Sequence, residues 1–84
     1  MPGGEASAFY SQETAEEAVQ YALDHGTIVE DTGAVRVLVA SFPENIGYVY
    51  DRNGTRTDTN IVRVVERILP NGTTFILTAY PVTP

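Results

Sequence analysis

The sequence predicts an α+β domain, in which one N-terminal amphipathic helix packs on a three- to four-stranded antiparallel sheet that ends in a β-hairpin. Apolar residues recur with helical spacing in the first third of the chain, and β-branched segments separated by turn residues fill the rest. The 84 residues suffice for one domain with a thin core. We assign residues 9–84 to this domain and residues 1–8 to a flexible tail or a truncation stub.

The helix is expected over residues 12–25. Thr14 and Glu17 fit a capping box, and Ser11 is a competing N-cap. Gly26 fits the position just past the C-terminal end. The apolar stripe follows the spacing i, i+3, i+4, i+7, i+8 and consists of Ala15, Ala18, Val19, Ala22 and Leu23.

The strands follow from composition and from turn residues. Val35 to Phe42 is apolar on both faces, which is typical of a central strand. Ile28-Val29 is a candidate for a short strand, and residues 56–59 have the composition of a polar loop. Asn71-Gly72 is a strong signal for a two-residue type I′ hairpin loop. Further strands are predicted at residues 48–50, 61–69 and 73–80.

That loop determines the pairing of the last hairpin, beginning with Pro70 opposite Thr73. Counting outward gives the pairs Ile68–Phe75, Val65–Thr78, Val64–Ala79 and Arg63–Tyr80. The face that the helix covers then carries Val62, Val64, Ile68, Phe75, Leu77 and Ala79. The opposite face carries Arg63, Val65, Arg67, Ile76, Thr78 and Tyr80. Glu66 does not fit the core face, which indicates a bulge or a position at the rim.

Arg63, Thr78 and Tyr80 are therefore expected on one surface of the sheet. A guanidinium suits bidentate contact with phosphate, and a tyrosine can stack on a base or hydrogen-bond a phosphate oxygen. A threonine hydroxyl both donates and accepts. In the alternative interpretation Thr78 and Tyr80 are ordinary strand formers and Arg63 is a solvated cross-strand neighbour. A slip of one residue would place Arg63 on the other face.

Charge and composition exclude several classes of function. Eleven acidic residues against five arginines give a net charge of -6, which argues against a general nucleic-acid coat and against DNA as a partner. There is no cysteine and only one histidine, His25, so we expect no metal site and no other cofactor. The longest apolar runs are too short to span a bilayer, and the first residues lack a signal-peptide pattern.

Three segments occur in a particular order. Ala6-Ser7-Ala8-Phe9 leads into Thr14-Ala15-Glu16-Glu17-Ala18-Val19, Asn45-Ile46-Gly47 precedes a short strand, and Phe75-Ile76-Leu77-Thr78-Ala79-Tyr80-Pro81 closes the chain. Over residues 6–81, this order resembles the bacterial RNase A-like toxin domain at the C-terminus of contact-dependent growth inhibition proteins and other polymorphic toxins.

The resemblance implies an RNase A-like fold without disulfides and metal-independent cleavage of RNA, with tRNA among the candidate substrates. It also implies a secreted or delivered toxin that acts in the target-cell cytoplasm and is neutralised by a cognate immunity protein. Thr78 and Tyr80 match the family's catalytic threonine and tyrosine. The first would position a base or phosphate, and the second would contact phosphate or transfer a proton. Arg63 has no counterpart in the family and is expected, from the strand register, to bind substrate.

The chain departs from the family pattern at its beginning. The family's catalytic histidine and arginine lie on a helix that precedes the Ala6-Ser7-Ala8-Phe9 segment, where this chain has Met1 to Glu5. We therefore expect ribonuclease activity only if the missing residues are supplied, and little or none otherwise. Two alternatives are a non-catalytic protein-interaction module and a small enzyme that uses His25 with a nearby carboxylate.

Overall fold

The chain folds as an α+β domain, and the computed structural model describes residues 6–84. Residues 1–5, part of the predicted tail, lie outside the described residues. Strand β1 begins at Ala6, within the segment that we assigned to the tail. The elements in chain order are β1 (Ala6–Phe9), α1 (Gln12–His25), β2 (Thr27–Asp31), β3 (Val35–Ser41), β4 (Gly47–Tyr50), β5 (Arg56–Thr59), β6 (Ile61–Ile68) and β7 (Thr74–Val82).

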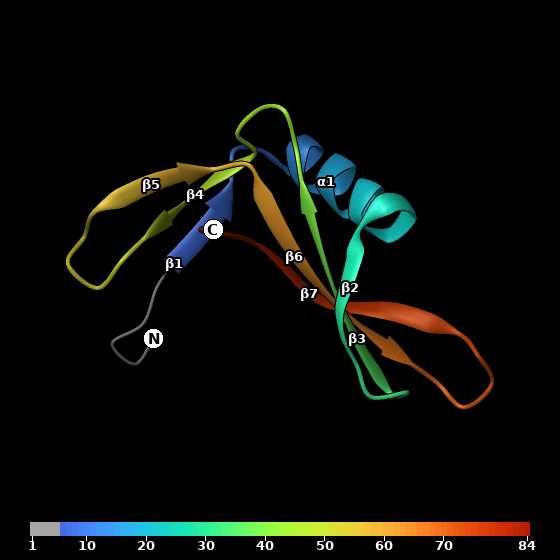
Figure 1. Ribbon diagram of the computed structural model, residues 1–84. Helices are drawn as coiled ribbons and strands as arrows, with labels where there is room; N and C mark the ends of the chain where they lie inside the picture. Colours follow the sequence, from blue (N-terminus) through green and yellow to red (C-terminus); the bar gives the residue numbers. More distant parts are fainter. Residues whose placement is uncertain (1–5) are drawn as a thin grey trace.

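The seven strands form two antiparallel sheets instead of one sheet of three to four strands. A three-stranded sheet has the order β1-β4-β5, and a four-stranded sheet has the order β2-β3-β6-β7. Figure 1 shows the two sheets as the arms of a bent molecule, with the C-terminal end of β7 beside β1 at the junction. The prediction of a polar loop at residues 56–59 was wrong, because this exposed polar segment pairs with β4 as an edge strand.

Helix α1 has the predicted bounds, and Ser11 is its N-cap. The Ser11 side chain accepts a hydrogen bond from the Thr14 backbone N–H at 3.0 Å, so the competing Thr14 cap is not used. The helix packs on β3 and β6. Small side chains allow a close approach there, and the buried core consists of Ala18, Ala22, Ala40, Ile46, Val62 and Val64.

The β6–β7 hairpin differs from the prediction at its tip. The Leu69 N–H donates to the Thr73 carbonyl at 2.8 Å, so three residues form the loop. Among the loop residues only Gly72 has a positive φ, of 90°, whereas a type I′ turn requires two such residues. Consequently the predicted pairs of Pro70 with Thr73 and of Ile68 with Phe75 are wrong, and Ile68 pairs with Thr74.

A bulge at Leu77 restores the predicted register nearer the C-terminus. The strand register shifts between Val65 and Glu66, and beyond it the three predicted pairs occur as expected. The extra residue of the loop and the extra residue of the bulge therefore cancel. In the segment of β7 between the loop and the bulge the register stays shifted by one residue. Phe75 and Leu77 are therefore 46% and 51% exposed instead of lying in the core.

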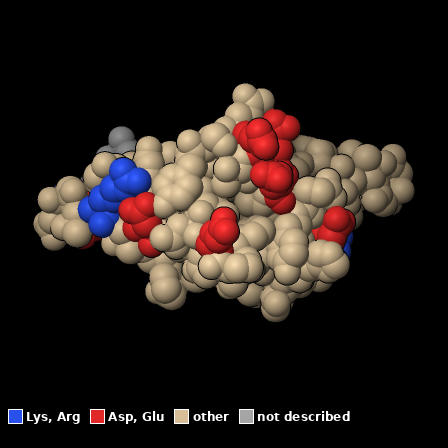
Figure 2. Space-filling model, turned by 90° about the horizontal axis from the view of Figure 1, so that it is seen from above, with Lys and Arg blue, Asp and Glu red and all other residues tan. Residues whose placement is uncertain are grey.

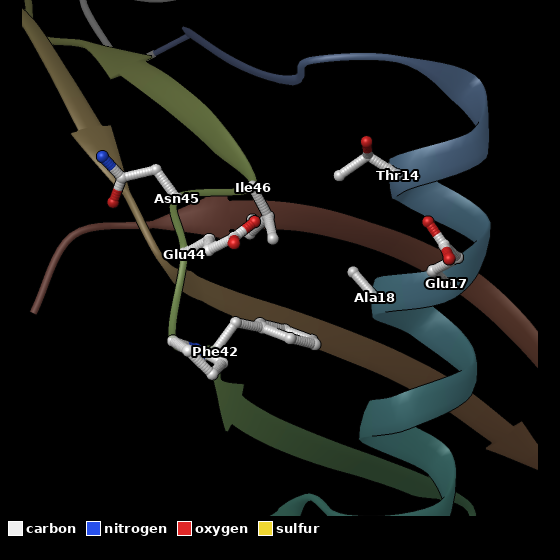
Figure 3. Close-up of a pocket in the computed structure, with 8 residues that line it drawn as sticks. Thr14, Glu17, Ala18, Phe42, Glu44, Asn45 and Ile46 are labelled. Atoms are coloured by element: carbon white, nitrogen blue, oxygen red, sulfur yellow. The ribbon is translucent and has the colours of Figure 1, made fainter.

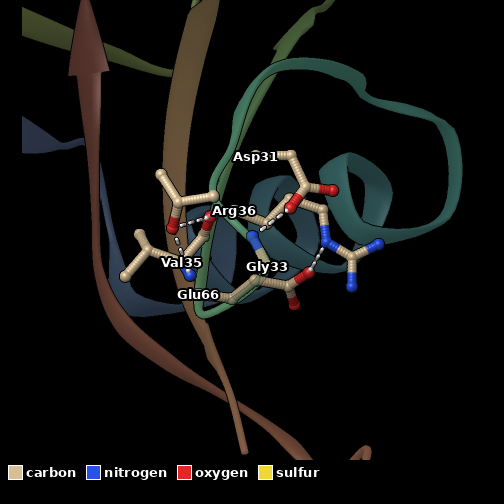
Figure 4. Close-up of polar contacts among 6 residues, drawn as sticks. Asp31, Gly33, Val35, Arg36 and Glu66 are labelled. Carbon is tan, nitrogen blue, oxygen red and sulfur yellow. Dashed lines mark hydrogen bonds and ion pairs between the residues drawn. The ribbon is translucent and has the colours of Figure 1, made fainter.

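Glu66 lies on the helix face next to the bulge, which is one of the two explanations expected for its misfit; it is buried and not at the rim, and an arginine accompanies it. Its carboxylate is buried, and Arg36 Nε of β3 lies 2.8 Å from Oε1 (Figure 4). Arg36 and Glu66 are direct cross-strand partners, so both side chains lie on the same face. The ion pair explains how a charged residue occupies a core position.

Candidate functional site

Arg63, Thr78 and Tyr80 lie on the face of the four-stranded sheet opposite α1. Arg63 and Tyr80 are direct cross-strand partners, and Thr78 stands opposite Val65. The residues between them in sequence, such as Val64, point into the helix-facing core. Thr78 is exposed, while Arg63 and Tyr80 are half-buried, so all three side chains reach solvent. The three side chains therefore share one accessible surface, as the register predicted.

Arg63 has no acidic partner within the part of the chain that the structure describes. All five arginines lie within residues 6–84, and in this part of the chain only Arg36 and Arg56 form ion pairs. The Arg63 Nε is buried and has no hydrogen-bond partner among the described residues. Arg67 on the same face shares this lack of an ion pair within the described residues, but Arg63 is the arginine that stands directly opposite Tyr80, so it is the one placed to bind an anion there.

Tyr80 borders a hollow of about 310 Å³ at the junction of the two sheets. The lining residues that the structure describes carry no carboxylate and comprise Ser7, Val49, Tyr80, Pro81, Val82 and Thr83. Four other hollows in the described part of the chain each contain at least one acidic residue. An anionic ligand would therefore meet the least repulsion beside Tyr80.

One of the acidic hollows, of about 330 Å³, lies between α1 and the β3–β4 connection. Figure 3 shows Thr14, Ala18 and Glu17 on the helix side and Phe42, Glu44, Asn45 and Ile46 on the other. With Glu17 on one wall and Glu44 on the other, this hollow is unsuited to phosphate.

His25 is remote from the predicted site. It is exposed at the end of α1, which packs on the opposite face of the sheet, and its ring centroid lies 5.1 Å from that of Tyr21. Neighbouring Asp24 accepts hydrogen bonds from Gln20 at 3.2 Å, and within residues 6–84 no carboxylate bonds to His25. This exposure gives no support to an enzyme built on His25 and a carboxylate.

A second polar cluster, which the sequence analysis missed, lies on the outer face of the three-stranded sheet. Arg56 binds Asp58 through two nitrogens, at 3.0 and 3.2 Å, and its Cζ lies 4.2 Å from the centroid of the Tyr48 ring. Tyr10 also donates a hydrogen bond to Asp58. Figure 2 shows basic side chains at this end of the molecule and separate acidic groups spaced over the otherwise uncharged face. The sequence signal for this cluster was the alternate spacing in Tyr48-x-Tyr50 and Arg56-x-Asp58, which places each pair on one face of a strand.

The cluster changes the ionisation of its members. Hydrogen bonds from Arg56 and Tyr10 hold the pKa of the Asp58 carboxyl below its usual value. The same bond to Asp58 raises the pKa of the Tyr10 phenol. Asp58 neutralises Arg56 within β5, and the contact of the Arg56 guanidinium with the Tyr48 ring links β5 to β4.

The described residues contain no group of three or more His, Cys, Asp or Glu side chains that could hold a metal ion. Within the same residues, no helix has both the length and the apolar character needed to cross a membrane.

No family model matches the sequence, and no curated protein matches it. Among solved structures, the chain is similar to a chain in the crystal structure of the CdiA-CT/CdiI complex from Y. kristensenii 33638. The TM-score is 0.78 at 20% sequence identity, and the match covers 95% of this chain and 79% of that chain. At this identity the likeness establishes a shared fold, which is the fold of a chain in a contact-dependent growth inhibition complex.

Proposed function

We propose that the chain is an RNA-cleaving toxin domain of a bacterial contact-dependent growth inhibition system, acting in the cytoplasm of the target cell. The observation that carries this proposal is the pairing of Arg63 with Tyr80, next to a hollow whose lining within residues 6–84 carries no carboxylate. The order of motifs over residues 6–81 and the fold shared with a chain of the CdiA-CT/CdiI complex support it.

The proposed reaction is an internal transphosphorylation of RNA. The ribose 2′-oxygen attacks the adjacent phosphorus, the bond to the 5′-oxygen breaks, and the products are a cyclic phosphate and a 5′-hydroxyl. Arg63 would donate hydrogen bonds to the phosphate as its charge develops. Thr78 would position the base or the phosphate, and Tyr80 would contact the phosphate or deliver a proton to the leaving oxygen.

The reaction also needs a base for the 2′-hydroxyl proton. His25 cannot reach this face, and it is the only histidine of the chain. We therefore expect slow cleavage from the chain alone, with faster cleavage when another segment or protein supplies a base.

Cleavage and binding of RNA test the proposal separately. The purified chain is incubated with total tRNA in EDTA, and the ends of the products are analysed. We expect slow release of 2′,3′-cyclic phosphates, with the rate reduced about tenfold in Tyr80→Phe. Tyr50→Phe, an exposed tyrosine of the other sheet, serves as the matched control and should leave the rate unchanged.

Binding is followed by titrating uridine 3′-phosphate into the labelled chain and recording amide chemical shifts. We expect shifts at Ser7, Tyr80 and Thr83, which line the hollow. A titration that leaves these amides unmoved, together with a cleavage rate that Tyr80→Phe does not alter, would refute the proposal.

A non-catalytic protein-interaction module is the second candidate, and the exposed apolar side chains of β7 favour it. A cognate immunity protein would be the partner under the first proposal as well, so partner binding alone does not separate the two. Failure to bind uridine 3′-phosphate, combined with tight binding of a protein partner, would favour the module.

A further inference from the structure

Helix α1 covers the two central strands of its sheet and leaves the edge strand β7 uncovered. The helix packs on β3 and β6, and β7 extends beyond it as the edge strand. Between the helix and this strand lies a groove of about 610 Å³. We call it the β7 groove, and its apolar lining is formed by Phe9, Ala15, Val19, Leu23, Ile76 and Ala79.

The β7 groove and its surroundings expose much apolar surface. Leu23 is 37% exposed on the helix wall, and Ile76 is 39% exposed on the strand wall. Phe75 and Leu77 on either side of Ile76 are also exposed, at 46% and 51%, although Phe75 pairs with Arg67 and so faces away from the groove. Apolar side chains concentrated beside a concave surface are typical of a site that binds another protein.

The backbone edge beside the β7 groove is also free. Residues Thr74 to Thr78 are exposed and carry no charge, and among the described residues β7 pairs only with β6. The other edge of the same sheet, β2, carries Glu30 and Asp31 and has a bulge after Ile28. Charges and bulges protect an edge against added strands, so β2 is the protected edge. On β7 the bulge at Leu77 limits the straight free edge to Thr74–Ile76.

We infer that this edge and the β7 groove bind an extended segment of another protein. The segment adds a short strand beside Thr74–Ile76, and its alternate apolar side chains enter the β7 groove. Basic residues flank the apolar ones, because Glu16 of α1 lines the groove on its helix side and the chain carries a net charge of -6. The surface lies on the helix face of the sheet, away from Arg63 and Tyr80, so the inference does not depend on the proposed function.

A second copy of the chain is a poorer occupant. Two β7 edges joined antiparallel would place two acidic α1 helices on the same side of one continuous sheet. Each copy carries a net charge of -6, so the electrostatic repulsion would oppose this arrangement.

The probe is a capped octapeptide, acetyl-Lys-Thr-Ile-Thr-Leu-Thr-Ile-Lys-amide, titrated into the labelled full chain by NMR. We expect amide shifts at Thr74–Ile76 and at Val19 and Leu23, with slower hydrogen exchange along the edge. The control peptide has the same side chains but carries N-methyl groups in place of the backbone N–H groups that would donate hydrogen bonds to β7. It should bind at least about tenfold more weakly.

Protein variants test the same surface from the other side. Ile76→Lys should weaken binding about tenfold or more. Val29→Lys, on the protected β2 edge and at a residue that is 54% exposed, should leave binding unchanged. Equal binding of the two peptides, or amide shifts that bypass β7, would overturn the inference. A chain that sediments as a dimer with its β7 edge already protected would also overturn it, since a second copy would then occupy the edge.

Discussion

Arg36 and Glu66 face each other across β3 and β6, with Arg36 Nε 2.8 Å from Oε1 of a carboxylate whose side chain is only 8% exposed. Removing the arginine leaves this carboxylate without its counter-charge. We expect Arg36→Met to lower the free energy of unfolding by about 3 kcal/mol, measured by urea denaturation. The double variant Arg36→Met/Glu66→Leu should recover most of the loss, and equal losses in the single and double variants would contradict this account.

The cap of α1 rests on one hydroxyl. Because Ser11 accepts a hydrogen bond from the Thr14 N–H, Ser11→Ala should cost about 1 kcal/mol of stability in thermal or urea unfolding. Thr14→Ala is the matched control and should cost less, since the Thr14 hydroxyl bonds only to that of Ser11. A larger effect of Thr14→Ala would show that the helix begins differently.

Gly47 lies at the junction of the two sheets and tolerates no side chain. A Cβ at this position would stand 2.4 Å from the Ala8 carbonyl oxygen and 2.6 Å from Pro81 Cγ. Gly47→Ala should therefore destabilise the domain by about 1–3 kcal/mol. Because Pro81 borders the hollow beside Tyr80, nucleotide binding should weaken as well. Unchanged binding and stability would mean that Ala8 and Pro81 can move apart at little cost to admit the added methyl group.

The Asp58 cluster predicts a dependence of stability on acid. The folded-state pKa of Asp58 is depressed below its ordinary value of 3.8, so its contribution is present above that pH and is lost as pH falls through the folded value. Asp58→Asn should be less stable than the parent at neutral pH, and the difference should shrink below about pH 4. Urea unfolding midpoints of the parent and of Asp58→Asn at several pH values measure this. A stability difference that does not change with pH would show that the Asp58 carboxylate does not stabilise the fold through its lowered pKa.

Two arginines on one strand offer a matched test of the anion site. Arg63→Gln should weaken binding of uridine 3′-phosphate about tenfold, because it removes the charge beside Tyr80. Arg67→Gln lies four residues away on the same face, about 13 Å along the strand, and should leave the affinity nearly unchanged. Equal effects would indicate a general charge effect and not a site.

Sequence patterns were most informative where the signal was local. The stripe from Ala15 to Leu23 and the end signals at Ser11 and Gly26 predicted a helix over about residues 12–25, where α1 lies, and alternation in β6 predicted which face carries Arg63. Strand β5 escaped prediction, because its exposed polar residues have no apolar alternation and its pairing with β4 is a tertiary contact.

The partners of Phe75 and Leu77 could not be predicted for a different reason. The turn signal at Asn71-Gly72 suits both a two-residue and a three-residue loop, and only the second displaces these side chains from the core. The placement of α1 over β3 and β6 depends on the small residues that meet there, such as Ala22 and Ala40.

The role of Thr78 and Tyr80 in catalysis stays a prediction.

The bulge at Leu77 makes the length of the hairpin tip independent of the strand register at the hairpin base. An insertion or deletion near Pro70 can be absorbed at Leu77, so the tip can change length while Arg63 stays opposite Tyr80. The tip is therefore a natural position for a fused tag or a fluorophore, and related chains should vary most in length there.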